Sequence, residues 1–214
     1  MRSHTRILPI GLLLASLTLS ACSVAPAPTA TPTATPQPPP PTWTPTPTSD
    51  PTPTPSPTPT PVPMVLSSPA FEPEGTIPED FGYFRQNISP ALNWENVPPG
   101  TRSLVLIMED TDTPYTHWVV YDIPADATTL EENRIPQPEM ADGTLQGLNS
   151  NQELGYIGPY PPDGETHTYL FTLYALDSTL DLSYGAAREE VLQAMNDHII
   201  ATCELRGTYT GVDL

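Results

Sequence analysis

The sequence predicts an all-β domain, a β-sandwich or a barrel, over residues 64–214. Short apolar runs rich in valine, leucine and aromatic residues alternate with turns rich in proline, glycine and aspartate, such as "NVPPGT", "DTDTP" and "GPYPPDGE". This pattern is typical of consecutive strands and not of strands that alternate with helices. A segment of this length buries one hydrophobic core, so we expect a single folded unit.

Three runs, 103–110, 117–124 and 167–177, are expected to be central strands. Each is apolar on both faces or rich in β-branched and aromatic residues, which is typical of a strand packed on both sides. One helix is expected over 184–197, with Ser183 as its N-cap. Its apolar stripe would cover an edge or a face of the sheet, and it consists of Ala187, Val191, Leu192 and Met195.

The first 21 residues are expected to be an export signal. Arg2 and Arg6 precede "ILPIGLLLASLTL", a run shorter than the roughly 20 apolar residues of a comfortable membrane span. "LSAC" follows and resembles a bacterial lipobox, which implies that Cys22 becomes a lipidated N-terminus. The alternative is an ordinary secretory peptide whose nearby cysteine stays unmodified.

Residues 22–63 are expected to be a disordered linker. They are almost entirely proline, threonine, alanine and serine, so they offer hardly any apolar surface to bury and favour extended, polyproline-like conformations. Together with a lipid on Cys22, this predicts an extracytoplasmic, membrane-anchored lipoprotein at the cell surface or in the periplasm, with the membrane leaflet left open.

The charge of the chain argues against nucleic acid as a partner, and its cysteine content argues against an intramolecular disulfide. Residues 64–214 carry 24 of the chain's acidic side chains, five arginines and no lysine, so nucleic acid is not expected as a partner. If Cys22 carries lipid, Cys203 has no partner for an intramolecular disulfide. Because Cys203 is in step with Ala201 and Leu205, we expect it to be a small buried residue and not a nucleophile.

Two of the four histidines, His117 and His167, each open an apolar run directly after a turn. Such positions are strand ends, where side chains from several loops converge. Alternation places His167, Tyr169 and Phe171 on one face of their strand. His198, at the expected helix end, is interpreted as a packing or capping residue.

The residues alone leave four interpretations of this region open. His117, His167, Asp110 and Asp112 are acceptable metal ligands, but "DTDTPYTHWVVY" lacks the spacing of an EF-hand loop. Neighbouring carboxylates at 110 and 112 do not make a glycosidase pair, and no G-x-S-x-G elbow is present. A small anion pocket built from histidines and backbone N–H groups needs neither lysine nor arginine. The fourth interpretation is purely structural, with aspartates capping turns and histidines bonded in the core.

Five ordered blocks resemble the phosphatidylethanolamine-binding protein family, in its bacterial Raf-kinase-inhibitor-like branch. They are "LSSPAFEPEGTIPEDF", "NISPALNWENVPPGTRSLVLIMEDTDTP", "HWVVYDIP", "GYIGPYPPDGETHTYLFTLYALD" and "MNDHIIATCELRGTYTG". The resemblance implies a Greek-key β-sandwich with a pocket for phosphate-like head groups, often shaped by a cis peptide. The pocket residues it implies are Asp110, Asp112, Pro114, His117, Gly158, Pro161, Pro162, His167 and Tyr169.

Three departures from the family pattern bear on this pocket. Relatives usually have an arginine where this chain has Thr168 and a cysteine where it has Tyr160, which implies a weaker anion site and a partly filled pocket. The loop between Pro114 and His117 is only "YT", which implies a more open mouth.

We therefore expect a binding module for a small anionic or phosphorylated ligand, with no catalytic residue, metal or cofactor. The alternative is a protein inhibitor that uses exposed apolar residues or the segment 64–71. A homodimer and a protein partner also stay open.

Overall fold

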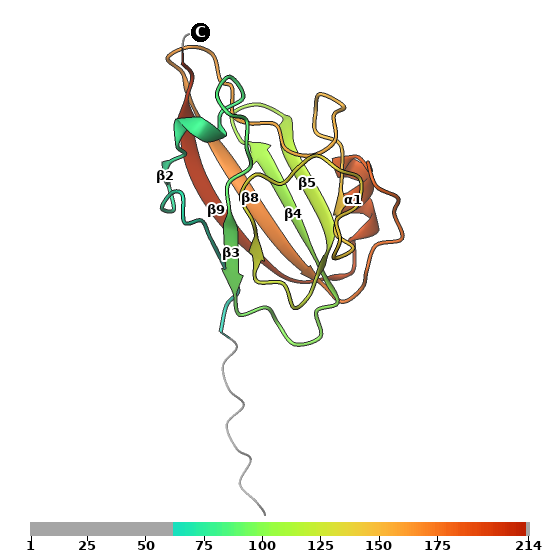
Figure 1. Ribbon diagram of the computed structural model, residues 1–214. Helices are drawn as coiled ribbons and strands as arrows, with labels where there is room; N and C mark the ends of the chain where they lie inside the picture. The colour runs from blue at the N-terminus through green and yellow to red at the C-terminus, as the bar shows by residue number, and fades with distance from the viewer. Residues whose placement is uncertain (1–61, 213–214) are drawn as a thin grey trace, which may run out of the picture. The chain divides into compact units, whose positions relative to one another are not determined.

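The structure is a computed structural model that describes residues 62–212, and these form two β-sheets and one short α-helix (Figure 1). The expected signal segment, Cys22 and the linker up to residue 61 lie outside this range. The larger sheet has the order β2-β9-β8-β4-β5-β7, and the smaller sheet has the order β1-β3-β6. All neighbouring strands are antiparallel except β2 and β9.

The strands of the larger sheet are β2 (Gly75–Thr76), β4 (Ser103–Asp110), β5 (Tyr115–Pro124), β7 (Leu145–Gln146), β8 (Thr166–Leu176) and β9 (Ile199–Thr210). Those of the smaller sheet are β1 (Val65–Ser67), β3 (Leu92–Glu95) and β6 (Thr129–Leu130). The 3-10 helix η1 (Glu79–Phe81) and the helix α1 (Arg188–Ala194) complete the elements. The expected mostly-β fold with two sheets is confirmed, and its Greek-key connectivity stays a prediction.

Strand β4 is apolar throughout because both faces of the larger sheet are covered. Leu104, Leu106 and Met108 belong to the core cluster that also contains Leu92 and Trp94 of the smaller sheet. On the other face, β4 and β5 contribute to a second core cluster with the helix. Its members from these three elements are Val105, Ile107, Val119, Tyr121 and Val191.

The three expected strands are confirmed as β4, β5 and β8, and β4 has the predicted bounds. The long strand β9 was not predicted. Its outward positions are exposed or half-buried and include Ile199, Ile200 and Glu204, so its apolar residues do not form the continuous run that marked the other three.

The helix prediction was wrong at both ends. The helix begins at Arg188 and ends at Ala194, and its N-cap is Ala187 and not Ser183. The Glu190 carboxylate accepts a 2.8 Å bond from the Ala187 N–H, as in the acidic half of a capping box. Gly185 before it has φ +78°, outside the right-handed helical region. The helix does cover a sheet face, as expected, but β9 follows it as the last strand.

Two further residues complete the comparison with the sequence. His198 is exposed and bonds the Asp177 carboxylate at 2.8 Å, so the packing role expected for it was wrong. Cys203 is half-buried against the core, and burial raises the pKa of its thiol to about 11. Such a thiol is a poor nucleophile at neutral pH.

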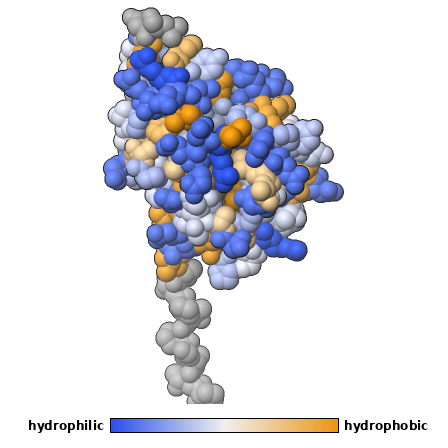
Figure 2. All heavy atoms as spheres, viewed as in Figure 1, coloured by the Kyte–Doolittle hydropathy of each residue, from blue (hydrophilic) through white to orange (hydrophobic). Residues whose placement is uncertain are grey.

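The visible face of the domain is mostly hydrophilic, with single apolar residues scattered over it (Figure 2). This matches the high acidic content of residues 64–214. Among residues 62–212, no helix has both the length and the apolar character needed to cross a membrane.

Candidate functional site

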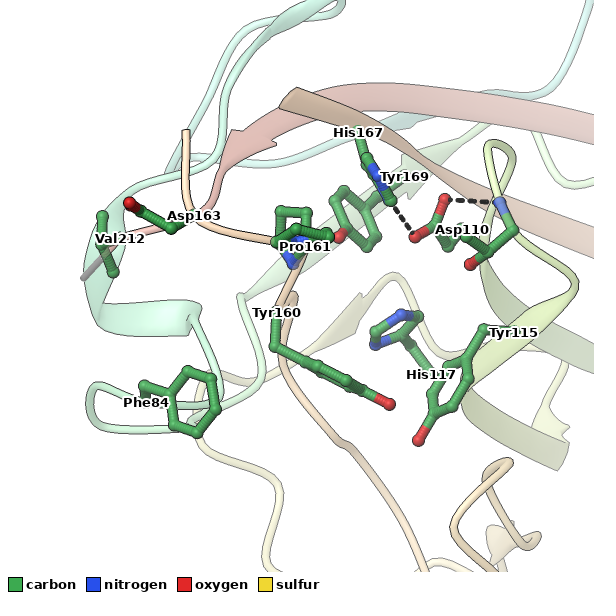
Figure 3. A pocket seen from close by; sticks show the side chains of 12 residues that line it. Phe84, Asp110, Tyr115, His117, Tyr160, Pro161, Asp163, His167, Tyr169 and Val212 are labelled. Atoms are coloured by element: carbon green, nitrogen blue, oxygen red, sulfur yellow. Dashed lines mark hydrogen bonds and ion pairs between the residues drawn. The ribbon is translucent and has the colours of Figure 1, made fainter. Parts of the chain in front are cut away.

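A pocket of about 710 Å³ opens at the end of the larger sheet where β4 ends and β5 and β8 begin (Figure 3). Aromatic, histidine, proline and acidic side chains line it, and no arginine does. The lining residues are Phe84, Asp110, Thr113, Tyr115, His117, Tyr160, Pro161, Pro162, Asp163, His167, Tyr169 and Val212.

Asp110, the last residue of β4, connects three segments of this site. Its Oδ1 accepts the N–H groups of Asp112 at 2.8 Å and Thr113 at 3.2 Å, which closes the turn after the strand. Its Oδ2 lies 2.7 Å from Nδ1 of His167 on β8 (Figure 3). The carboxylate therefore fixes both the turn and the histidine.

His117 is the extra residue of a β-bulge. Met108 pairs with Trp118 and Glu109 pairs with Thr116, so nothing on β4 stands opposite His117. Strict alternation would place His117 on the same sheet face as Val119, which packs against the helix. A bulge re-aims a side chain, and here it sends the imidazole into the pocket.

The protonation state of His117 follows from its hydrogen bond. Its Nδ1 lies 2.8 Å from the Ile157 carbonyl oxygen, which only accepts, so Nδ1 carries the hydrogen. Burial lowers the pKa of His117 to about 4, although the Ile157 carbonyl and Asp110 act in the opposite direction. At neutral pH the ring is therefore uncharged, and its Nε2 is an acceptor.

His167 has the opposite character. The hydrogen bond with Asp110 raises the pKa of His167 against the smaller effect of desolvation, and Asp112 and Glu165 raise it further. Its Nε2 lies 3.6 Å from the exposed Glu165 carboxylate. Among the lining residues, His167 is thus the only basic side chain whose protonated form is favoured. The carboxylates of Asp110 and Glu165 already balance that positive charge.

Tyr169 forms the floor of the pocket between the two histidines. Its side chain is fully buried, and its ring centroid lies 5.1 Å from that of His117. Its hydroxyl oxygen is also buried and makes no well-formed hydrogen bond with the described residues. Burial raises the pKa of this hydroxyl, and the backbone of Tyr160 acts in the opposite direction.

The loop that carries Tyr160 and Pro161 is fixed to the segment after η1. The Tyr156 hydroxyl donates to the Phe81 carbonyl at 2.9 Å, and the Tyr83 N–H donates to the Pro159 carbonyl at 2.9 Å. A Cβ on Gly158 would collide with the Phe81 carbonyl oxygen, so only glycine permits this close approach.

Six of the nine predicted site residues line the pocket. They are Asp110, His117, Pro161, Pro162, His167 and Tyr169. The other three are not among the lining residues. Gly158 packs closely against Phe81, Asp112 accepts the Thr168 N–H at 2.7 Å, and Pro114 borders a separate cavity of about 120 Å³. The ligand role of all nine stays a prediction.

The cis peptide suggested by the family resemblance is not seen, because every peptide bond of residues 62–212 is trans. The same residues contain no group of three or more His, Cys, Asp or Glu side chains placed to hold a metal ion.

Sequence reasoning missed part of the lining. Phe84 and Val212 come from loops that carry no periodic signal, and Asp163 sits inside a turn motif that predicts only a turn. Thr113 and Tyr115 flank the predicted Pro114, so the "DTDTPY" segment held a usable local signal.

Residues 67–210 match the phosphatidylethanolamine-binding protein family. The chain belongs to this family.

Two similar proteins are each named UPF0098 protein. The one from Methanothermobacter thermautotrophicus is 46% identical, and the match covers 68% of this chain and 98% of the relative. The one from Aquifex aeolicus is 42% identical, and the match covers 68% of this chain and 88% of the relative. A phosphatidylethanolamine-binding protein homologue from Chlamydia trachomatis has a solved structure with a TM-score of 0.63 and 40% identity, and covers 69% of this chain and 97% of that one. The structure of E. coli YbcL has a TM-score of 0.63 and 26% identity, and covers 70% and 99%. The pocket thus belongs to a domain that makes up nearly the whole of these four relatives.

Neutral His117 should make the stability of this family member depend on pH. Its pKa is lowered in the folded state, so the unfolded chain binds more protons as the pH falls from about 6.5 toward 4, and stability is lost in that window. The lost part is about 3 kcal/mol. In His117→Asn, whose amide can still donate to Ile157, the difference in unfolding free energy between pH 7 and pH 4 should shrink by that amount in urea titrations. An unchanged difference would show that His117 is not held neutral.

Replacing Asp110 should lower the pKa of His167. Asp110→Asn removes the charged acceptor 2.7 Å from Nδ1, while Glu165→Gln removes an exposed carboxylate 3.6 Å from Nε2. We expect the His167 ring-proton resonances to titrate at a lower pH in Asp110→Asn, with a smaller decrease in Glu165→Gln. An equal decrease in the two variants would contradict the dominant role given to Asp110.

Proposed function

We propose that this protein is a non-enzymatic binding module whose pocket takes a small ligand with a phosphoryl group. The observation that carries the proposal is the pocket of about 710 Å³ that His117 and the hydrogen-bonded pair Asp110 and His167 line. A concave site with a few convergent polar groups supports the binding of a small polar ligand.

The two histidines would meet the phosphoryl group differently. His167, with its raised pKa, favours an anion nearby. Neutral His117 offers an acceptor Nε2, and a phosphoryl oxygen can bond it only if that oxygen carries a hydrogen. The site therefore suits a monoanionic phosphomonoester with one P–OH group, whose second pKa lies near 6.

Phosphate and phosphoethanolamine should bind the purified protein saturably. We expect both to shift the ring-proton resonances of His117 and His167. The affinity for the phosphomonoester should rise by roughly tenfold or more as the pH falls from 8 to 6, because with a second pKa near 6 the monoanionic fraction grows from about a hundredth to about half. His117→Ala should abolish the His167 shifts at the same concentrations.

Absence of saturable shifts at millimolar phosphate would sink this proposal. Turnover of a phosphoester that His117→Ala abolishes would instead show that the pocket is an active site.

The second candidate is a protein inhibitor, and exposed aromatic residues at the pocket mouth favour it. Tyr83 and Phe84 are 38% and 46% exposed, and their rings contact one another with centroids 5.0 Å apart. The segment 64–71 is less suited to a partner, because Met64, Leu66 and Phe71 are buried in the core. A partner captured through Tyr83 and Phe84, in a protein that binds no phosphate, would favour this candidate.

We also propose that the module is held outside the cytoplasm by a lipid on Cys22 and a linker of residues 22–63. The support is the "LSAC" sequence and the Pro/Thr-rich composition alone. Cys22→Ser should move the protein from the membrane fraction to the soluble fraction, and the mature N-terminal peptide of the unaltered protein should carry the mass of a lipid by mass spectrometry. Membrane association that survives Cys22→Ser would contradict the anchor.

A further inference from the structure

The two edges of the larger sheet are covered unequally within residues 62–212. At one edge, the Gln146 N–H of β7 donates to the Pro138 carbonyl at 3.3 Å, and the Gln146 carbonyl accepts the Gly185 N–H at 2.8 Å. At the other edge, the short strand β2 pairs only with Gly207 and Thr208 of β9 (Figure 1). Strand β9 has 12 residues, so most of its outer edge has no neighbouring strand among the described residues.

The direction of the free backbone groups of β9 follows from its bond to the segment of β2. The Arg206 carbonyl accepts the Glu74 N–H at 2.8 Å, so the backbone groups of Arg206 point away from β8. Backbone groups alternate between the two edges of a strand, and the pairing with β8 is regular over residues 201–210. Glu204 and Thr202 therefore point outward as well. No other segment of residues 62–212 bonds their backbone on this side.

This part of β9 is open to solvent. The side chains of Thr202 and Glu204 are exposed, and β1, which lies close to β9, pairs with β3 instead. Proteins usually protect such an edge with proline, lysine or a covering segment, and residues 199–205 contain neither proline nor lysine. We call residues 199–205 the open edge. Its unpaired N–H and C=O groups form a template for a further strand.

The open edge has two faces with different chemistry. Ala201 and Cys203 are half-buried and pack against the core cluster, so their side chains lie on the inner face. Thr202 and Glu204 alternate with them and lie on the outer face. The side chains of an added strand lie beside those of its neighbour on each face. Apolar β-branched residues therefore fit the inner face, and polar or basic residues fit the outer face.

The charge of the domain favours a basic segment over a second copy of this chain. Residues 64–214 have 24 acidic residues against five arginines, and Glu74 and Glu204 are exposed beside the open edge. Arg206, the only basic residue of β9, already lies 3.1 Å from Glu204. Two copies paired edge to edge would bring like charges together, whereas a lysine or arginine beside Glu204 would form a favourable cross-strand pair.

We propose that the open edge binds an extended segment of another protein, in which basic or polar residues alternate with apolar β-branched residues. The segment adds to β9 as an antiparallel strand, which is the more stable direction per residue and places its basic residues opposite Thr202 and Glu204. This surface is separate from the pocket, because none of residues 199–205 lines it. The inference does not depend on the ligand of the pocket.

A short synthetic peptide tests the proposal directly. The acetylated and amidated peptide Thr-Val-Lys-Val-Thr places its lysine on the outer face and its valines on the inner face. It is added to the full chain with Cys22→Ser, which removes the proposed lipid site. Amide hydrogen exchange followed by NMR should slow at Thr202 and Glu204, and should stay unchanged at Ala201 and Cys203, whose amides point toward β8.

Two N-methylated peptides distinguish strand addition from other modes of binding. A methyl group on the backbone nitrogen of the lysine removes a donor that points at β9, so binding should be lost in the NMR titration. A methyl group on the backbone nitrogen of the second valine lies on the opposite edge of the peptide, so the affinity should be nearly unchanged. The two peptides have the same composition and charge.

Variants of the chain test the edge and the charge separately. Thr202→Pro removes one outward N–H at a position where an edge strand tolerates proline, and it should abolish binding. Glu204→Gln should weaken binding of the lysine peptide by about two- to fivefold, as expected for an exposed ion pair, and should not weaken binding of the same peptide with glutamine in place of lysine. Glu132→Gln, which changes an exposed carboxylate outside β9, is the matched control and should alter neither affinity.

Three results would overturn the proposal. The first is equal binding of the two N-methylated peptides, and the second is a lack of any binding at millimolar peptide. The third is self-association of the unaltered protein that slows exchange at Thr202 and Glu204 without peptide, because it would assign the open edge to a second copy. The peptide pair keeps the test decisive even where Thr202→Pro does not fold.

Discussion

The hydrogen bonds of Asp110 are the constraint on which the site depends. One carboxylate oxygen closes the turn after β4, and the other bonds Nδ1 of His167 on β8. Strand pairing alone places Asp110 opposite Tyr169 and fixes neither the turn nor the imidazole. Because the carboxylate is mostly buried, it needs these partners, and the same bond holds the histidine at the pocket. The same hydrogen bonds therefore stabilise the buried carboxylate and fix the geometry of the site.

The two histidines acquire different charges from similar positions at strand ends. His117 is displaced by a bulge into an aromatic and backbone environment, where burial outweighs its hydrogen bond to the Ile157 carbonyl. His167 meets a carboxylate directly, and that bond outweighs desolvation. Their contributions to stability consequently depend on pH in opposite directions. That of His117 is lost as the pH falls below about 6.5, and that of His167 is lost as the pH rises through its raised folded-state pKa.

The sequence predicted the parts of the fold that burial on both faces makes conspicuous. Strands β4, β5 and β8 were visible because residues such as Leu106, Val119 and Phe171 leave no polar face. Strand β9 was missed because its outer face meets solvent, and the helix was predicted too long because no periodicity reports the positive φ of Gly185. Six predicted site residues do line the pocket, since short motifs at strand ends carry them. Phe84, Asp163 and Val212 reach it through loop conformations and tertiary packing, which leave no local pattern in the chain.

The charge of the domain limits how this pocket recognises a ligand. With five arginines against 24 acidic residues in residues 64–214, no excess of positive charge attracts an anion from solution, and salt screens such attraction over about 10 Å in any case. Selectivity must then come from short-range groups, namely the acceptor nitrogen of His117 and the Asp110–His167 pair. The acceptor nitrogen of His117 can bond only a group that brings its own hydrogen. A group of low net charge also has a smaller electrostatic cost on entering an acidic, partly desolvated site.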